Sequence, residues 1–241
     1  WEITGMGENS LKGIDVAILA GGLGTRIKGI LGDTPKVLAP INDRAYLDYL
    51  LEWLDGFGAS RIIMCLGHLA QKVENHLQGR GGVECIVEPE PLGTGGAVRF
   101  CRDAFRSDHL LVMNGDTWLE MDLAPFVTAH LNSNSNISMV CVQVEDVSRY
   151  GKVKIRDHLV TGFTEKDPKD KGPGFINAGV YLLSQKALND LCKMNARSLE
   201  IDFFFELKPG SILAFIPEKA KFIDIGTPES LATAVSVLPA S

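Results

Sequence analysis

Short apolar runs alternate with amphipathic segments along the first half of the chain, and this alternation limits the fold more than any other feature of the sequence. The apolar runs span 15–19, 61–67, 83–89 and 109–116, and the amphipathic segments span 45–57, 70–77 and 94–105. Such alternation is typical of βαβ units, whose strands run parallel and whose helices cover the sheet. We therefore expect a parallel sheet with crossover helices in this half.

The second half of the chain has a different pattern. A helix at 124–132 is followed by closely spaced strands, which favour an antiparallel or mixed extension of the sheet. Strands are expected at 137–144, 152–155, 159–166, 177–183, 211–217 and 221–226, and helices at 185–192, 199–207 and from Pro228 onward. The predicted fold is α/β, with a Rossmann-like mixed and mainly parallel sheet flanked by helices.

The length of the chain allows one large domain. With 241 residues and no linker, we expect a single domain over 14–241. Residues 1–13 are polar and glycine-rich, so they are expected to be an N-terminal extension, either native or the remnant of an expression tag.

Charge and cysteine content exclude several classes of function. The formal net charge is −6 and no run of Lys or Arg is present, which argues against a nucleic-acid partner. No apolar segment approaches the roughly 20 residues of a membrane span. The five cysteines are odd in number and form no C-x-x-C pair, which favours reduced core cysteines and a cytoplasmic protein.

A glycine-rich loop, GGLGTR, follows the first predicted strand. Its three glycines, Gly21, Gly22 and Gly24, leave backbone N–H groups free to converge on a phosphate chain. Neither common phosphate loop fits, because Ile27 replaces the third glycine of G-x-G-x-x-G and Thr25 replaces the lysine of the P-loop. A simple strand-to-helix turn is the alternative interpretation.

Two further glycine-marked segments follow predicted strands. Gly93–Gly96 comes after the third strand and Asn114–Asp116 ends the fourth. In open parallel sheets, ligands bind beyond the carboxyl ends of the strands. The three segments are therefore expected to share one edge of the sheet and to form a binding site there.

Seven short blocks follow one another between about residues 14 and 235: LAGGLGTR, PKVLAPI, EPLGTGGA, NGD, FTEK, NAGVYLL and FIDIGTPE. Together they resemble the sugar-phosphate nucleotidyltransferases, also called nucleotide-sugar pyrophosphorylases. Within that family, PLGTGGA and the absence of a β-helix tail are most similar to the D-glycero-D-manno-heptose 1-phosphate guanylyltransferases. Mannose 1-phosphate guanylyltransferases and the small uridylyl-, thymidylyl- and cytidylyltransferases are the alternatives.

The resemblance implies a nucleotide-diphospho-sugar transferase fold and a reaction. A sugar 1-phosphate attacks the α-phosphorus of an NTP, with GTP favoured, and gives an NDP-sugar and pyrophosphate. The NTP and the sugar 1-phosphate are thus the expected small-molecule partners, and the oligomeric state stays open, a homodimer included. A non-catalytic nucleotide-sugar-binding paralogue would be expected to lose the site's cations or an aspartate. A dinucleotide-binding oxidoreductase is disfavoured by Ile27.

Site residues follow from the matching blocks. Arg26 and Lys36 are expected to be catalytic, because both can neutralise the leaving pyrophosphate. The expected nucleotide-binding residues are Leu19, Ala20, Gly21, Gly22, Gly24, Thr25, Glu88, Pro91, Gly93, Thr94, Asn114 and Gly115. The expected sugar-phosphate-binding residues are Gly151, Glu165, Lys166, Asn177 and Gly179.

Several of these positions also have a plain structural interpretation. A carboxylate at Glu88 can accept from the N–H groups of guanine, but uracil and thymine also present one N–H, and the position suits an exposed charge. Gly179 can be a close-packing strand glycine, and Gly151 a turn glycine. Glu200 suits a capping or solvent-exposed role as well as a place over the sugar. Val37 and the segment NDRAYL depart from the family pattern, so the loop after Ile41 is expected to differ in shape.

Asp116 and Asp224 are the expected ligands of Mg²⁺. Each closes an apolar run, which would place two carboxylates on the same edge of the sheet. Mg²⁺ prefers one or two carboxylates together with phosphate and water oxygens. The alternative is that each aspartate caps the helix that follows it.

Overall fold

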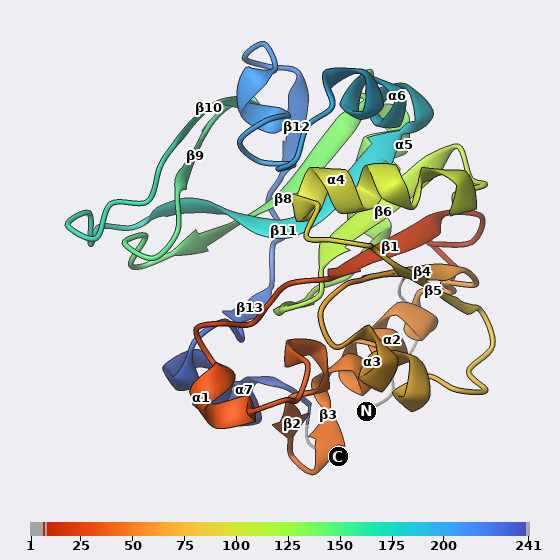
Figure 1. Ribbon diagram of the computed structural model, residues 1–241. Coiled ribbons are helices and arrows are strands. Elements are labelled where there is room, and N and C mark those ends of the chain that lie inside the picture. The colour runs from red at the N-terminus through yellow and green to blue at the C-terminus, as the bar shows by residue number, and fades with distance from the viewer. Residues whose placement is uncertain (1–6, 8, 240–241) are drawn as a thin grey trace.

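A mixed nine-stranded sheet runs through the computed structural model, which describes residues 7 and 9–239 (Figure 1). In spatial order its strands are β5 (Val83–Val87), β4 (Ile62–Leu66), β1 (Asp15–Ala20), β6 (His109–Asn114), β11 (Gly174–Ser184), β8 (Ile137–Val144), β12 (Ile212–Phe215), β10 (Leu159–Thr164) and β9 (Lys152–Arg156). The first four strands are parallel, as the alternating pattern predicts. Beyond β6 the sheet is mixed: β11 is antiparallel to β6 and β8, whereas β12 is parallel to β8.

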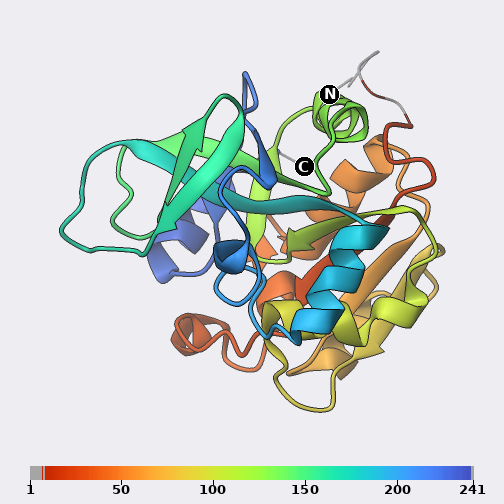
Figure 2. The same cartoon turned by 90° about the horizontal axis from the view of Figure 1, so that it is seen from above.

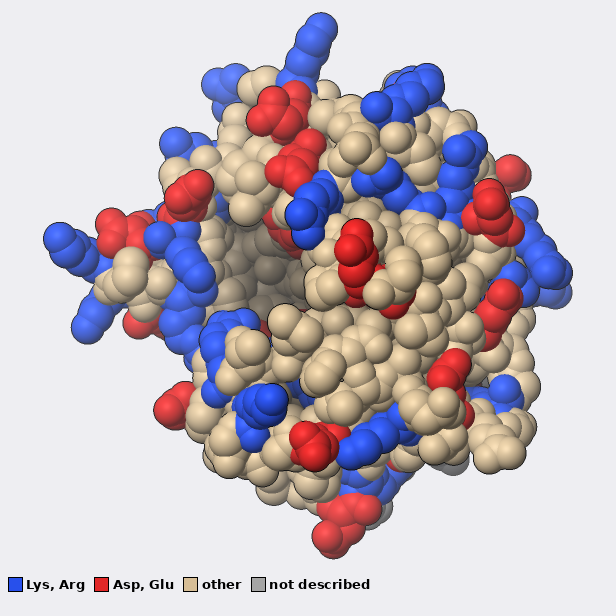
Figure 3. Space-filling model, viewed as in Figure 1, with Lys and Arg blue, Asp and Glu red and all other residues tan. Residues whose placement is uncertain are grey.

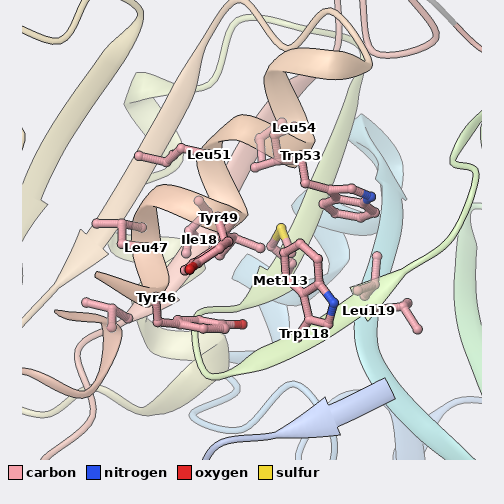
Figure 4. Close-up of a cluster of buried hydrophobic side chains, with 14 of the residues drawn as sticks. Ile18, Tyr46, Leu47, Tyr49, Leu51, Trp53, Leu54, Met113, Trp118 and Leu119 are labelled. Carbon is pink, nitrogen blue, oxygen red and sulfur yellow. The ribbon is translucent and has the colours of Figure 1, made fainter. Parts of the chain in front are cut away.

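Helices cover both faces of the sheet because its central strands are apolar on both sides. Val16 and Ile18 of β1 face the core under α2 (Tyr46–Gly56) and α3 (Ala70–His76), whereas Ala17 faces the core under α4 (Gly93–Phe100) and α6 (Gln185–Met194). Figure 4 shows the core on the side of α2 and α3, where Tyr46, Trp53 and Trp118 lie beside Ile18 and Met113. α5 (Ala124–Asn132) and α7 (Pro228–Val237) belong to the same side. The predicted layered α/β fold is thus confirmed.

The strands β9 and β10 form a lobe that projects from the rest of the molecule (Figures 1 and 2). They pair antiparallel with each other and join the sheet through β12 and the start of β11. The lobe therefore rises beside the edge at which the parallel strands end.

The structure differs from the predicted elements in several places. Residues 199–207 form no α-helix but turns and a 3₁₀ turn, Phe204–Glu206, because the Glu200 side chain bonds to Thr94 of α4 and to Tyr181 of β11, and these long-range bonds outweigh the local helix preference. The sequence also missed α1 (Lys28–Leu31) and β7 (Thr117–Glu120), and two 3₁₀ turns, Lys36–Leu38 and Arg102–Ala104. The segment NDRAYL contains a hairpin of β2 (Pro40–Ile41) and β3 (Arg44–Ala45), and Asn42 and Asp43 hold the positive φ angles that its turn requires.

Part of the predicted N-terminal extension is described by the structure. Residues 1–6 and 8 lie outside the described residues, but Leu11 is fully buried and its amide donates to the Phe57 carbonyl. Asn9 packs closely on Gly58, whose φ is +77°. The segment from Asn9 to Gly13 therefore packs on the domain, although its polar composition places it outside.

Candidate active site

A pocket of about 440 Å³ opens at the carboxyl ends of β1 and β6. Figure 3 shows a hollow on this face of the molecule, with basic and acidic side chains around its rim. All residues predicted for catalysis or nucleotide binding line the pocket, together with Asp116. The sequence missed Leu23, Ile27, Pro35, Val37, His68, Ala97 and Gly226. Of these, Gly226 follows a strand end in the way that Gly21 does, and this signal could have identified it.

The first glycine loop is shaped around a carboxylate. A Cβ atom on Gly21 or on Gly67 would lie 2.7 Å from Oε1 of Glu88. Oε2 of Glu88 accepts a hydrogen bond of 3.2 Å from the Leu92 amide, and burial raises the pKa of Glu88. Glu88 is thus an anchored group in the pocket wall and not an exposed charge at a strand end.

The glycines that begin α4 serve packing more than phosphate binding. A Cβ on Gly93 would lie 2.5 Å from the carbonyl oxygen of Arg197, and that oxygen accepts hydrogen bonds from Gly95 N at 2.7 Å and Gly96 N at 3.1 Å. The hydroxyl of Thr94 is also engaged, because it accepts from Leu199 N and donates to Glu200. The amides of Gly95 and Gly96 are therefore not available to a ligand.

Asp116 and Asp224 lie side by side, but not by the predicted route. Asp116 lies in the turn between β6 and β7, and Asp224 ends β13 (Lys221–Asp224), which pairs antiparallel with β7 in a separate two-stranded sheet. Asp224 is opposite Thr117 in this pairing, and Ile225 N donates to the Asp116 carbonyl at 2.9 Å. The edge of the main sheet therefore supplies only one of the two aspartates.

Asp224 does not cap the helix that follows it. α7 is capped by Thr227, whose hydroxyl accepts from Ser230 N while Ser230 Oγ accepts from Thr227 N, and Pro228 occupies its first turn. The Asp224 carboxylate instead accepts a 2.6 Å hydrogen bond from Gly226 N. The helix-cap interpretation of Asp224 is therefore wrong.

Lys36 forms an ion pair with one of these carboxylates. Its Nζ lies 2.6 Å from Oδ2 of Asp116, and its side chain is 14% exposed. A Cβ on Gly226 would lie 3.1 Å from Lys36 Nζ and 2.6 Å from Asp224 Oδ1, so the ammonium and both carboxylates surround one small space. Arg26, in contrast, is exposed at the mouth of the glycine loop.

The residues around this space fit a divalent cation. The space exists because residue 226 has no side chain, and the hydroxyl of the fully buried Tyr46 has no hydrogen-bond partner. The pKa of Tyr46 is raised well above its usual value, first by burial and then by the charges of Asp116 and Asp224. Among the described residues no three His, Cys, Asp or Glu side chains form a metal cluster, so a cation here needs further oxygens from a ligand or water.

The residues predicted for the sugar phosphate divide into two groups, and none of them lines the pocket. Asn177 and Gly179 lie in an irregular part of β11, where Gly179 has a φ of +71° and its Cβ position lies 2.6 Å from the Asn114 side chain. Close packing on Asn114 therefore explains Gly179, and the Gly179 amide donates to Oδ1 of Asn177 at 2.8 Å. Gly151 packs on the Thr164 carbonyl, beside the exposed Glu165 and Lys166 on the β9–β10 lobe.

The fold and this site define a nucleotidyltransferase. Residues 15–240 match the family model described as nucleotidyl transferase, and the chain belongs to that family. No helix among the described residues is long and apolar enough to cross a membrane. The five cysteines are free, as expected.

The curated relatives include two D-glycero-alpha-D-manno-heptose 1-phosphate guanylyltransferases. The protein from Campylobacter jejuni is 36% identical over 88% of this chain and 94% of its own length, and that from Aneurinibacillus thermoaerophilus is 31% identical over 90% and 94%. Among solved structures, HddC from Yersinia pseudotuberculosis has a TM-score of 0.82 and 38% identity, over 92% of this chain and 98% of that one. A second HddC structure, with a TM-score of 0.81, is a complex with GMP-PN.

Proposed function

We propose that this chain transfers a guanylyl group from GTP to a heptose 1-phosphate, giving GDP-heptose and pyrophosphate. The observation that carries the proposal is the convergence of three strand-end segments on one pocket that also holds Lys36 and Asp116. The names of the heptose 1-phosphate guanylyltransferases at 31% and 36% identity support the choice of substrates.

The reaction needs positioning and charge neutralisation more than covalent catalysis. A phosphate oxygen of the sugar 1-phosphate forms a bond to the α-phosphorus of GTP, and the bond from that phosphorus to the β-phosphate bridging oxygen breaks. The nucleophile is already an anion, so no general base is required. The chain must hold two anions close together and stabilise the charge on the leaving pyrophosphate.

Residues of the pocket can bind the triphosphate, and residues of the neighbouring β9–β10 lobe can bind the sugar phosphate. The exposed backbone of Gly21, Gly22 and Gly24 receives the triphosphate, and Arg26 neutralises the leaving group. Lys36 moves from Asp116 to the phosphates when they arrive. Lys166, on the neighbouring lobe, acts as a point charge on the phosphate of the sugar.

Asp116 and Asp224 would hold Mg²⁺. When bound with the nucleotide, the ion supplies charge neutralisation at the phosphates. Each carboxylate would supply one oxygen ligand, and phosphate and water oxygens would complete the shell.

Guanine selectivity is assigned to Glu88. Its carboxylate is held in the pocket wall by Leu92 N, Gly21 and Gly67, so it can accept from the two N–H groups on the Watson–Crick edge of guanine. A carboxylate repels the acceptor oxygens that uracil and thymine present beside their single N–H.

One experiment tests reaction, base and sugar together. The protein is incubated with Mg²⁺, each of GTP, ATP, UTP, dTTP and CTP, and a panel of sugar 1-phosphates that includes heptose and mannose 1-phosphate, with pyrophosphate release as the readout. Release with GTP and heptose 1-phosphate is expected to be the fastest. A preference for mannose 1-phosphate would move the assignment to that class, and no release with any pair would contradict an enzymatic role.

A further inference from the structure

A hydrogen-bonded chain connects the nucleotide pocket to β11 through Glu200. One carboxylate oxygen of Glu200 accepts from the hydroxyls of Thr94 and Ser198, each at 3.1 Å, and the other accepts from the hydroxyl of Tyr181 at 3.0 Å. Thr94 lines the pocket, and Tyr181 is fully buried below it in β11. Glu200 therefore bridges the helix α4 and the strand β11.

The chain continues from Tyr181 to the residue predicted to bind the sugar. The side-chain amide of Asn177 donates to the Tyr181 hydroxyl at 2.7 Å, and Oδ1 of Asn177 accepts from Gly179 N at 2.8 Å. These bonds span the place where the register of β11 shifts against β8. They fix the orientation of the Asn177 side chain in a stretch of β11 where the regular backbone pairing with β8 is interrupted.

The two ends of this chain are secured differently. On the nucleotide side, α4 has independent support, because the Arg197 carbonyl accepts from Gly95 N and Gly96 N and Leu199 N donates to Thr94. On the β11 side, Glu200 is the acceptor of the Tyr181 hydroxyl. Loss of Glu200 would leave a buried hydroxyl without its acceptor, which is costly, whereas α4 would keep its other bonds.

We propose that Glu200 is a positioning residue that orients Asn177 for the sugar phosphate by way of Tyr181, without contacting either substrate. The proposal rests on the function proposed above. Glu200 orients the Tyr181 hydroxyl, and that hydroxyl holds the side-chain amide of Asn177, so loss of either group leaves Asn177 held only by its bond from Gly179 N. Loss of a link should therefore weaken binding of the sugar phosphate and leave binding of the nucleotide unchanged.

The test compares KM values for both substrates in Glu200→Ala and Tyr181→Phe. Each variant is expected to raise the KM for the sugar 1-phosphate about 5- to 10-fold, the effect of one lost hydrogen bond of about 1 to 1.5 kcal/mol, and to leave the KM for GTP within about 2-fold. Because the groups act in series, the double variant should match the single ones. Glu200→Gln keeps an oxygen that can accept from Tyr181, so it should recover most of the wild-type KM and serves if Glu200→Ala does not fold.

The control is Glu206→Ala, an exposed acidic residue on the neighbouring 3₁₀ turn, which should behave as wild type. Binding of a non-hydrolysable GTP analogue, measured by calorimetry without sugar phosphate, should be unchanged in all variants. Equal rises in both KM values, additive effects, or an unchanged sugar KM in Tyr181→Phe would overturn the proposal. These outcomes differ from failure of the proposed function, in which the wild-type protein itself releases no pyrophosphate.

Discussion

Lys36 and Arg26 both carry a positive charge into the pocket, but their surroundings differ. Lys36 is mostly buried and paired with Asp116, while Arg26 is exposed and forms no ion pair among the described residues. The Lys36 ammonium, paired with Asp116 and beside the space that Asp224 also lines, reduces the repulsion between the two carboxylates. An unpaired guanidinium beside bare glycine amides is free to meet an incoming anion. Lys36 thus has to leave Asp116 before it can meet the phosphates, whereas Arg26 has no ion pair to break.

Arg26→Ala should therefore damage catalysis without damaging the fold. We expect turnover to fall by a factor on the order of 10² to 10³, because the variant removes charge stabilisation at the leaving pyrophosphate. The melting temperature should be unchanged, since an exposed side chain is lost. Steady-state kinetics with a thermal melt measures both, and Arg156→Ala, an exposed arginine on β9, is the matched control. Wild-type turnover in Arg26→Ala would contradict the assigned role.

Lys36→Met should change metal binding before any nucleotide is present. The Lys36 ammonium pairs with Asp116 beside the small space that Asp224 also lines, so a divalent cation bound there has to compete with it. Removal of the ammonium is expected to tighten Mn²⁺ binding at least about 10-fold, as measured by electron paramagnetic resonance of free Mn²⁺. Arg26→Met removes the same charge from the same pocket but from outside this space, and it should tighten binding much less. Equal tightening of Mn²⁺ binding in Lys36→Met and Arg26→Met would mean that only the net charge of the pocket matters, and not the position of Lys36.

At the scale of elements, the parallel half of the sheet could be predicted because its signals are local. Apolar runs form the parallel strands β1, β4, β5 and β6. The glycines that follow these strands mark the edge of the sheet at which the pocket lies. The pairing of β7 with β13 could not be predicted, because it joins segments far apart in the sequence and β7 is short. The absent helix at 199–207 has a similar cause. Its polar groups bond to α4 and β11, and these long-range bonds override local helix preference.

The capping of α7 gives an element-scale prediction about Asp224. Thr227 and Ser230 form a reciprocal capping box, so Thr227→Ala should lower the free energy of unfolding by about 1 kcal/mol. Asp224→Asn lies outside the cap and should change stability little while abolishing most activity. Urea unfolding and pyrophosphate release separate the two effects. A large stability loss in Asp224→Asn, with activity retained, would return that residue to a structural role.

At the scale of the whole molecule, the two ends of the central strands lie in different surroundings: one end lines the pocket, and the other end carries a pair of histidines. β6 ends at Asn114 in the pocket and begins at His109, on the opposite edge of the sheet. There His109 Nδ1 and His130 Nε2 lie 3.0 Å apart, and His130 Nδ1 lies 2.7 Å from the buried Ser138 hydroxyl. Protonation at this edge can therefore affect stability without direct contact with the site.

His130 should make the protein less stable in mild acid. Burial, and then the charge of His109, lowers the pKa of His130 to about 4, from an ordinary value of 6.5. Between these values the unfolded chain binds a proton that the folded protein does not, so the free energy of unfolding falls as the pH falls from about 6.5 to about 4. The contribution of one such group is at most about 1.4 kcal/mol per pH unit. Below about pH 4 the folded protein also binds the proton, and the contribution stops changing.

His130→Gln keeps a polar group beside Ser138 but has no group that titrates. Urea unfolding at several pH values from 7.5 to 4.5 should therefore give a shallower slope of stability against pH in this variant than in the wild type. The comparison uses slopes and not absolute stabilities, because the substitution in a buried position has its own cost, and the carboxylates that titrate in this range do so in both proteins. Identical slopes would show that His130 is not the group responsible. A shallower slope with unchanged turnover at neutral pH would show that acid sensitivity resides at the edge of the sheet opposite the pocket.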